Sequence, residues 1–142
     1  MARMADDPSP LAQALDRVGD RWSFLIVDAL MTSPLRFNEL SKAVAGIAPN
    51  VLSVRLERLQ AARVITSTPY SQRPLRYEYQ LTDEGRELAG VLRLLSSWGQ
   101  GAEPSELGLR HDVCGTRLEA QWYCPTCAAV VTEEEGSELR RL

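Results

Sequence analysis

Residues 36–66 read RFNELSKAVAGIAPNVLSVRLERLQAARVIT, and the spacing of apolar residues in this stretch decides the fold. Apolar side chains recur every three or four positions, which predicts one helix over residues 36–44 and a second over residues 49–62. Gly46 supplies the turn that ends the first helix, and Pro49 opens the second. Two helices joined by so short a turn predict a helix-turn-helix arrangement.

The segments on either side of this stretch complete an order of elements. Helical spacing predicts a helix over residues 10–18 and a second, mostly buried helix over about residues 21–31. Beyond the central stretch, β-branched residues at 64–68 and alternating residues at 76–81 predict a hairpin, and Thr82 caps a last long helix. This order predicts an α+β fold: a mainly helical winged helix-turn-helix domain with a two-stranded wing.

The composition is that of an ordinary globular protein. Of the 142 residues, 44% are hydrophobic and 25% are charged, which excludes wholesale disorder. No run approaches the roughly 18 uncharged apolar residues that a membrane-spanning helix needs. Residues 1–10 also lack the apolar core of a secretory signal. We therefore expect a cytoplasmic protein with no membrane partner.

The charge is distributed unevenly along the chain. The formal net charge is −3, which taken alone argues against a nucleic-acid partner. Residues 101–142, however, hold 4 basic and 8 acidic residues, whereas residues 33–76 hold 7 basic residues and only 2 acidic ones. The resulting charge of +5 over residues 33–76 is either an ordinary solvated face or a surface that faces phosphate. The winged scaffold favours the second interpretation.

Several phrases of the sequence carry a resemblance to a known family. They are GDRW at 19–22, RFNEL at 36–40, IAP at 47–49, LSVRL at 52–56 and RYEYQLTDEG at 76–85. Over roughly residues 8–100 the chain resembles the HxlR-type branch of the MarR-like winged-helix transcription regulators. The resemblance implies a homodimeric, sequence-specific DNA-binding regulator whose dimer is built mainly from the first and last helices of the domain.

The chain departs from this family at one position. Members that sense electrophiles or oxidants carry a cysteine immediately before the proline that opens the first helix, and here Ser9 precedes Pro10. A hydroxyl without an activating base cannot perform thiolate chemistry. Redox sensing by that route is therefore not expected, and the sequence identifies no small-molecule effector.

The predicted DNA contacts lie on the helix-turn-helix and on the hairpin. In the major groove, Asn50 can pair with adenine and Val54 can meet a thymine methyl group. Arg55 has two interpretations, a phosphate contact or an ion pair that holds the helix against its neighbour. Arg73 and Arg76, at the hairpin tip, suit a minor groove or flanking phosphates. The full predicted set is Arg36, Lys42, Asn50, Ser53, Val54, Arg55, Arg58, Arg73 and Arg76.

The last helix carries enough apolar residues to form a core face and a second face. The apolar side chains of Leu94 and of the helix that contains residues 11–15 also need burial. This need predicts contact with a second copy of the chain. The predicted dimer-interface residues are Leu11, Leu15, Leu88, Val91, Leu92, Leu95 and Trp98.

All three cysteines and the single histidine lie in one short window. Two ligand pairs, HDVC at 111–114 and CPTC at 124–127, flank a short linker, which is a zinc-ribbon pattern. A module of about 40 residues rarely folds on its own core, so a metal is physically expected. We predict a structural Zn²⁺ ion held by His111, Cys114, Cys124 and Cys127, in which His111 takes the place of a fourth cysteine. The alternatives are a redox pair at CPTC and unliganded thiols.

These observations divide the chain into a flexible arm (1–9), the winged domain (10–100), a linker (101–109), a zinc-ribbon-like module (110–132) and an acidic tail (133–142). The predicted function is a homodimeric repressor that binds a pseudo-palindromic operator. An enzyme is not expected, because no Ser–His or carboxylate dyad is spaced for catalysis, although a thiol oxidoreductase acting through CPTC remains the enzymatic alternative. Two further alternatives are a zinc-dependent interaction module of the transcription machinery and a regulator that senses oxidants through the C-terminal cysteines.

Overall fold

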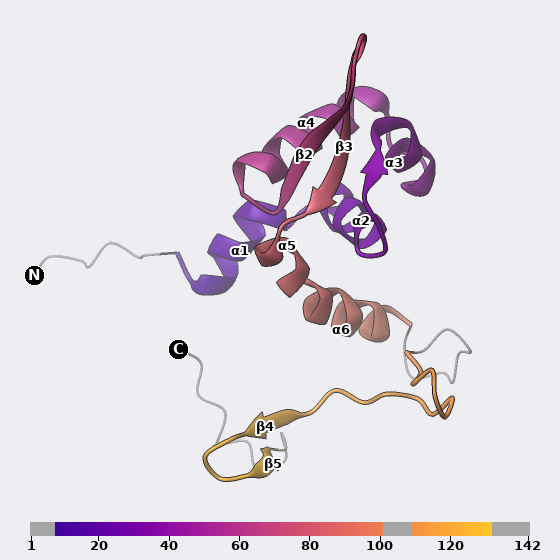
Figure 1. The fold of residues 1–142 in the computed structure, drawn as a ribbon. Helices are drawn as coiled ribbons and strands as arrows, with labels where there is room; N and C mark the ends of the chain where they lie inside the picture. Colours follow the sequence, from indigo (N-terminus) through magenta and orange to yellow (C-terminus); the bar gives the residue numbers. More distant parts are fainter. Residues whose placement is uncertain (1–7, 101–108, 132–142) are drawn as a thin grey trace, which may run out of the picture. The chain divides into compact units, whose positions relative to one another are not determined.

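The computed structural model describes residues 8–100 and 109–131 (Figure 1). The chain separates into two compact units between Leu92 and Arg93. The predicted acidic tail and nearly all of the predicted arm and linker lie outside the described residues. Within the described ranges, no helix is both long and apolar enough to cross a membrane.

Two helices begin the first unit, as predicted, and a side chain caps the start of each. α1 (Pro10–Val18) starts at Ser9, whose Oγ accepts a hydrogen bond from the N–H of Ala12 at 3.1 Å. α2 (Arg21–Leu30) starts at Asp20, whose carboxylate caps its first turn. Such caps satisfy backbone N–H groups that have no partner inside the helix.

The central stretch forms β1 (Leu35–Arg36), α3 (Phe37–Ala43) and α4 (Pro49–Ala61). The predicted helix-turn-helix is present, but the first of its helices begins one residue later than expected. Arg36 has an extended backbone and pairs with Glu78 in an antiparallel ladder, so it cannot belong to the helix.

The wing is the hairpin of β2 (Ile65–Gln72) and β3 (Leu75–Leu81), which projects beyond the helices in Figure 1. The prediction of two strands is incomplete, because β1 also pairs with β3 and the sheet has three strands in the order β1-β3-β2. A two-residue strand is too short to show an alternating pattern, which is why sequence reasoning missed it.

The predicted last long helix is divided into α5 (Asp83–Glu87) and α6 (Ala89–Gly99). The N–H of Leu88 bonds to the carbonyl of Gly85, three residues back rather than four, and this tight turn separates the two helices.

The core of the first unit lies between the helices and the sheet. It combines the inner faces of α1 to α4 with the inner ends of β2 and β3 and the first turn of α6. Its buried members are Val18, Ile26, Val27, Leu30, Leu40, Val44, Ile47, Leu52, Leu56, Leu59, Val64, Ile65, Leu81 and Leu92.

The second unit holds a small antiparallel sheet of its own. β4 (Trp122–Cys124) pairs with β5 (Ala129–Val131), and an isolated bridge joins Arg110 to Arg117. Gly115 has a φ of 70°, a left-handed conformation that glycine adopts without strain, and lies in the turn that follows Cys114.

Candidate nucleic-acid interface

α4 has one buried face and one exposed face. Leu52, Leu56 and Leu59 are at most 2% exposed and pack into the core. The opposite face exposes most of the predicted DNA-reading residues of this helix, namely Asn50, Ser53, Val54 and Arg58. The helix can therefore remain packed on its own domain while it presents polar atoms to a second molecule.

The hydroxyl of Ser53 is already engaged as a donor. It donates a hydrogen bond to the carbonyl oxygen of Pro49 at 3.1 Å. Because a serine hydroxyl has one hydrogen, its oxygen is left to act as an acceptor in this conformation. Ser53 is thus suited to the amino group of adenine or cytosine rather than to a base carbonyl.

Arg55 lies on the flank of α4 that faces the start of α2. Its Nε is 3.2 Å from Oδ1 of Asp20, and its side chain is 22% exposed. Among the described residues this buried Nε has no hydrogen-bond partner, so the contact with Asp20 is an ion pair. Of the two interpretations of Arg55, the ion pair to a neighbouring helix is the arrangement present in the structure.

Asp20 uses both carboxylate oxygens on the first turn of α2, and its Oδ1 also pairs with Arg55 of α4. Oδ1 accepts from the N–H groups of Trp22 and Ser23, and Oδ2 accepts from the Ser23 hydroxyl at 2.6 Å. Burial is the largest single influence and acts to raise the pKa of Asp20. Hydrogen bonds from Ser23, the charge of Arg55 and the N–H of Trp22 together outweigh burial, so this pKa lies below its ordinary value of 3.8.

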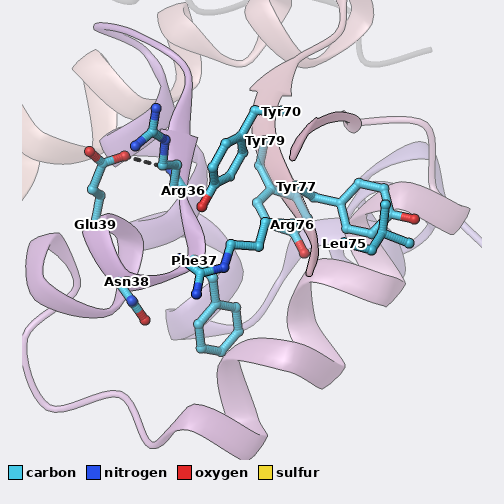
Figure 2. Close-up of a pocket in the computed structure, with 9 residues that line it drawn as sticks. All are labelled: Arg36, Phe37, Asn38, Glu39, Tyr70, Leu75, Arg76, Tyr77 and Tyr79. Atoms are coloured by element: carbon cyan, nitrogen blue, oxygen red, sulfur yellow. Dashed lines mark hydrogen bonds between the residues drawn. The ribbon is translucent and has the colours of Figure 1, made fainter. Parts of the chain in front are cut away.

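A hollow of about 550 Å³ lies between the start of α3 and the wing (Figure 2). At its wall the guanidinium carbon of Arg36 is 4.2 Å from the centroid of the Tyr70 ring, a cation–π contact. The backbone N–H of Arg36 donates to Oε2 of Glu39 at 2.7 Å. The hollow is lined by Arg36, Phe37, Asn38, Glu39, Tyr70, Leu75, Arg76, Tyr77 and Tyr79. Sequence reasoning predicted the two arginines but missed the tyrosines, although their concentration in the hairpin strands was a usable signal.

The other predicted basic residues are also exposed. Lys42 lies in the last turn of α3, and Arg58 lies in the last turn of α4. Arg73 occupies the tip of the wing, where its peptide bond to Pro74 is cis. Among the predicted DNA contacts, Arg55 is thus the one basic residue that is not exposed.

The predicted dimer-interface residues differ in exposure. Leu92 is 7% exposed and packs within the core, and Leu88 is partly buried against it. Trp98 is 81% exposed and Leu11 is 68% exposed. The remaining members, Leu15, Val91 and Leu95, are exposed as well, as is Leu94.

The structure brings the predicted zinc ligands together in pairs but not as a group of four. Nδ1 of His111 is 3.3 Å from Sγ of Cys114, and Cys124 receives hydrogen bonds from Cys127. Within residues 8–100 and 109–131, no group of three or more histidine, cysteine or carboxylate side chains is close enough to hold a metal ion.

Hydrogen bonds also change the acidity of two of these thiols. The hydroxyl and the N–H of Thr116 lower the pKa of Cys114. The N–H and side chain of Cys127, with the N–H of Thr126, lower the pKa of Cys124. Both thiolates are therefore formed more readily than that of an unperturbed cysteine.

Comparison with known proteins places the winged domain in a family. Residues 17–106 match the model of the HxlR-like helix-turn-helix family. An uncharacterised HTH-type transcriptional regulator of Mycobacterium tuberculosis strain H37Rv is 34% identical over 126 residues, which is 86% of this chain and 79% of that protein. The crystal structure of PA1607, a candidate transcription factor, superposes with a TM-score of 0.74 at 30% identity, over 92% of this chain and 93% of that one.

A further similar structure is that of a redox regulator. The oxidised form of HypR has a TM-score of 0.61 and 27% identity, over 68% of this chain and 99% of that one. In this chain the residue before the opening proline is Ser9, which caps α1 through its Oγ. That position therefore has a structural role here that needs no thiol chemistry.

The fold and the comparisons agree. The chain has the helix-turn-helix and the wing in the order that the sequence predicts, and β1 adds a third strand to the sheet. The relatives and neighbours described above are transcription regulators rather than enzymes. From the match over residues 17–106 and the similarity over most of its length, the chain belongs to the HxlR-like helix-turn-helix family of transcriptional regulators, with a MarR-like winged-helix fold.

Proposed function

We propose that the protein is a homodimeric repressor that binds a pseudo-palindromic DNA operator. The observation that carries the proposal is the division of α4 into a buried leucine face and an exposed polar face. In helix-turn-helix proteins the second helix of the motif enters the major groove, and a dimer reads two half-sites about 34–36 Å apart. α4 is the second helix of this motif.

Three residues near the start of α4 read the bases. Asn50 donates to and accepts from adenine, and Val54 contacts a thymine methyl group. Ser53 accepts a hydrogen bond from a base amino group, because its own hydrogen is held by the carbonyl of Pro49. Substitution of any of the three changes which sequence is preferred.

The hollow between α3 and the wing holds one sugar–phosphate strand. Arg36 and Arg76 contribute two positive charges to its lining, and the stacking of Arg36 on Tyr70 orients that guanidinium in advance. Arg73, at the exposed tip, reaches the adjacent minor groove or its phosphates. These contacts add affinity for any DNA sequence and make binding dependent on salt.

The dimer forms through the exposed apolar residues of α1 and α6. Single exposed leucines are ordinary, but α1 exposes two large apolar side chains and α6 exposes four, including Leu15 at 48% and Trp98 at 81%. We expect Leu15→Glu to dissociate the dimer in analytical ultracentrifugation, whereas Gln13→Glu, an added charge at an exposed position of the same helix, leaves it intact. A monomeric wild type contradicts this part of the proposal.

We also propose that His111, Cys114, Cys124 and Cys127 hold one structural zinc ion. Three thiolates and an imidazole are a donor set that Zn²⁺ binds as a tetrahedron, and each pair already lies within a tight turn. Because the described residues bring the ligands together only in pairs, metal binding also has to join the two pairs, and its free energy then contributes to folding of the module.

Metal analysis of the full chain tests the zinc site. We expect about one zinc per chain, consistent with a closed four-ligand site. Cys114→Ser lowers the zinc content, and Thr126→Ser, which changes no ligand, leaves it unchanged. A full-length protein with reactive thiols that takes up no zinc overturns the proposal.

Selection from a randomised DNA library tests the main proposal. We expect enrichment of an inverted repeat, and Asn50→Ala should change the enriched half-site while Gln13→Ala does not. The sign of regulation follows from a reporter promoter that carries the selected site, where expression falls if the protein is a repressor. If no sequence is enriched at any salt concentration, the alternative of a protein-interaction module is favoured instead.

A further inference from the structure

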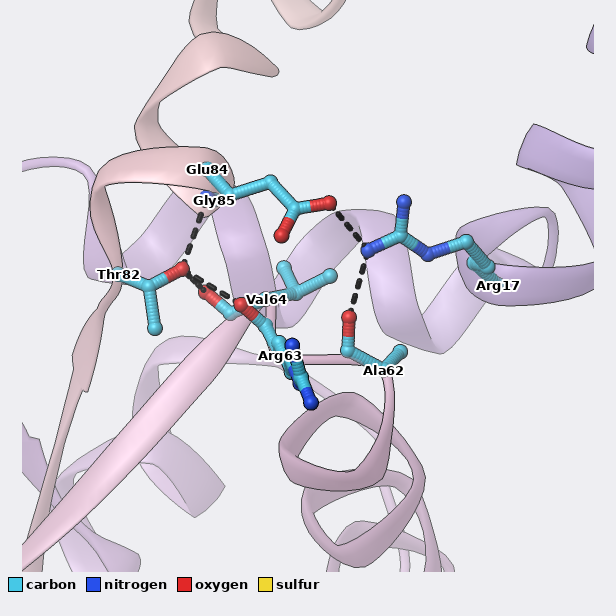
Figure 3. Close-up of polar contacts among 7 residues, drawn as sticks. All are labelled: Arg17, Ala62, Arg63, Val64, Thr82, Glu84 and Gly85. Carbon is cyan, nitrogen blue, oxygen red and sulfur yellow. Dashed lines mark hydrogen bonds and ion pairs between the residues drawn. The ribbon is translucent and has the colours of Figure 1, made fainter.

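The C-terminal end of α4 is held by residues of α1 and of the start of α5 (Figure 3). Three consecutive carbonyl groups after the helix each accept a hydrogen bond from a distant residue. Nη2 of Arg17 donates to the carbonyl of Ala62 at 2.6 Å. The hydroxyl of Thr82 donates to the carbonyl of Arg63 at 2.6 Å, and its N–H donates to the carbonyl of Val64 at 3.1 Å.

Arg17 joins this end of α4 to α5 as well. The same Nη2 is 2.5 Å from Oε1 of Glu84, in the first turn of α5. The Thr82 hydroxyl also accepts the N–H of Gly85 at 3.0 Å, so Thr82 caps α5 while it binds the end of α4. A side chain on Gly85 would collide with the carbonyl of Val64, which shows how closely α5 is packed at this point.

A second contact from the same corner of the chain holds the middle of α4. Asp20 pairs with Arg55, and only two residues separate Asp20 from Arg17. The corner between them is tight, because a Cβ on Gly19 would collide with the backbone of Leu15. The N–H of Gly19 also bonds to the carbonyl of Leu15 at 2.6 Å.

We propose that Arg17 and Asp20 are positioning residues that set the orientation of α4 for sequence discrimination without touching DNA. Two separated contacts, one at the middle of α4 and one at its end, restrict both rotation and tilt of the helix. Base reading requires side chains to be placed within about 0.5 Å, whereas phosphate attraction tolerates displacement. The inference rests on the proposed DNA binding, and it predicts loss of specificity rather than loss of affinity for all DNA.

The geometry argues against a direct role of Arg17 on DNA. Recognition helices contact bases mainly with their N-terminal residues. Arg17, a residue of α1, instead contacts the C-terminal end of α4. Its Nη2 is shared between a backbone carbonyl and Glu84. A residue placed in this way acts on recognition through the helix that it holds.

Affinities for two kinds of DNA distinguish a residue that positions α4 from one that contacts DNA directly. Arg17→Met and Asp20→Asn are compared with Arg86→Met, which removes an exposed positive charge from α5. Affinities for the selected operator and for unrelated DNA are measured over a range of salt, well below the unfolding temperature. We expect the ratio of the two affinities to fall by roughly fivefold or more in Arg17→Met and Asp20→Asn, the lower end of the cost of one lost base contact. Affinity for unrelated DNA and the salt slope stay at the wild-type values.

Two outcomes of this comparison overturn the inference. A ratio within twofold of wild type in both variants means that Arg17 and Asp20 affect folding alone. A salt slope reduced by about one in Arg17→Met means that this residue contacts phosphate itself. Arg17→Lys, which retains the positive charge and a donor, is expected to recover part of the ratio and guards against a variant that fails to fold.

Hydrogen exchange of the free, full-length protein tests the same contacts without DNA. The amides of Ala62, Arg63 and Val64 bond to carbonyls within α4, and these bonds open more often if the end of the helix is released. We expect severalfold faster exchange of these amides in Arg17→Met and no change in Arg86→Met. Unchanged exchange in Arg17→Met overturns the inference whatever the DNA result. A wild type that selects no operator instead contradicts the proposed function.

Discussion

Substitutions at two nearby residues of α4 should affect different properties, one the stability of the fold and the other the recognition of DNA. Leu52 is 0% exposed and lies in the core, whereas Val54 is 53% exposed on the opposite face. Leu52→Ala leaves a cavity among fully buried neighbours and costs about 3–5 kcal/mol of unfolding free energy. Val54→Ala removes exposed methyl groups and stays within about 0.5 kcal/mol of wild type.

These free energies translate into a large difference in thermal stability. In domains of this size, 1 kcal/mol shifts the midpoint by roughly 4–8 °C. Leu52→Ala is therefore expected to unfold at least about 12 °C below wild type, and Val54→Ala no more than about 4 °C below it. Protein concentration must be equal in all samples, because dimerisation adds to apparent stability.

Urea unfolding and operator selection together provide the assay. Unfolding followed by tryptophan fluorescence gives the loss of stability, and selection on folded Val54→Ala shows whether preference for thymine at its contact position is lost. If Val54→Ala loses as much stability as Leu52→Ala, the assignment of the two faces of α4 is wrong. If its selected sequence matches that of wild type, Val54 does not read DNA.

The remaining predictions concern a carboxylate, the wing and a glycine. Asp20 has a lowered pKa, so its contribution to stability is present above about pH 3.8 and is lost as the pH falls through its folded-state pKa. The difference in urea midpoint between wild type and Asp20→Asn should therefore shrink on acidification below pH 3.8. A difference that widens instead contradicts this prediction. Arg73→Ala should weaken binding to every DNA sequence and reduce the salt slope by about 0.9, as measured by fluorescence anisotropy, and an unchanged slope removes Arg73 from the interface. Gly85→Ala should lower the urea midpoint because the added Cβ meets the carbonyl of Val64, although helix propensity alone favours alanine by about 0.8–1 kcal/mol; a raised midpoint refutes that packing.

Much of the fold could be predicted because it depends on local patterns. The leucine spacing of α4, the proline at its start and the cap at Thr82 all act within a few residues, so the sequence indicates them directly. The alternation over residues 76–81 likewise indicated β3. The structure confirms these elements, while the DNA contacts, the dimer surface and the zinc ligands remain predictions.

Other features of the fold depend on contacts that no local pattern contains. β1 is a strand only because β3 lies beside it, and the break at Leu88 accompanies the packing of Gly85 against Val64. The tyrosines of the hollow lie close to Arg36 only because the hairpin folds back toward α3.

The sequence by itself thus determined the winged helix-turn-helix and which side of its second helix is apolar, because hydrophobic periodicity reports burial residue by residue. Only the tertiary structure decided what the charged residues contact. Arg55 faces either phosphate or a carboxylate according to where α2 lies, and Arg17 reaches the end of α4 only in the folded domain. Long, flexible side chains have many partners within reach, so their contacts are set by the packing of helices that are distant in the chain.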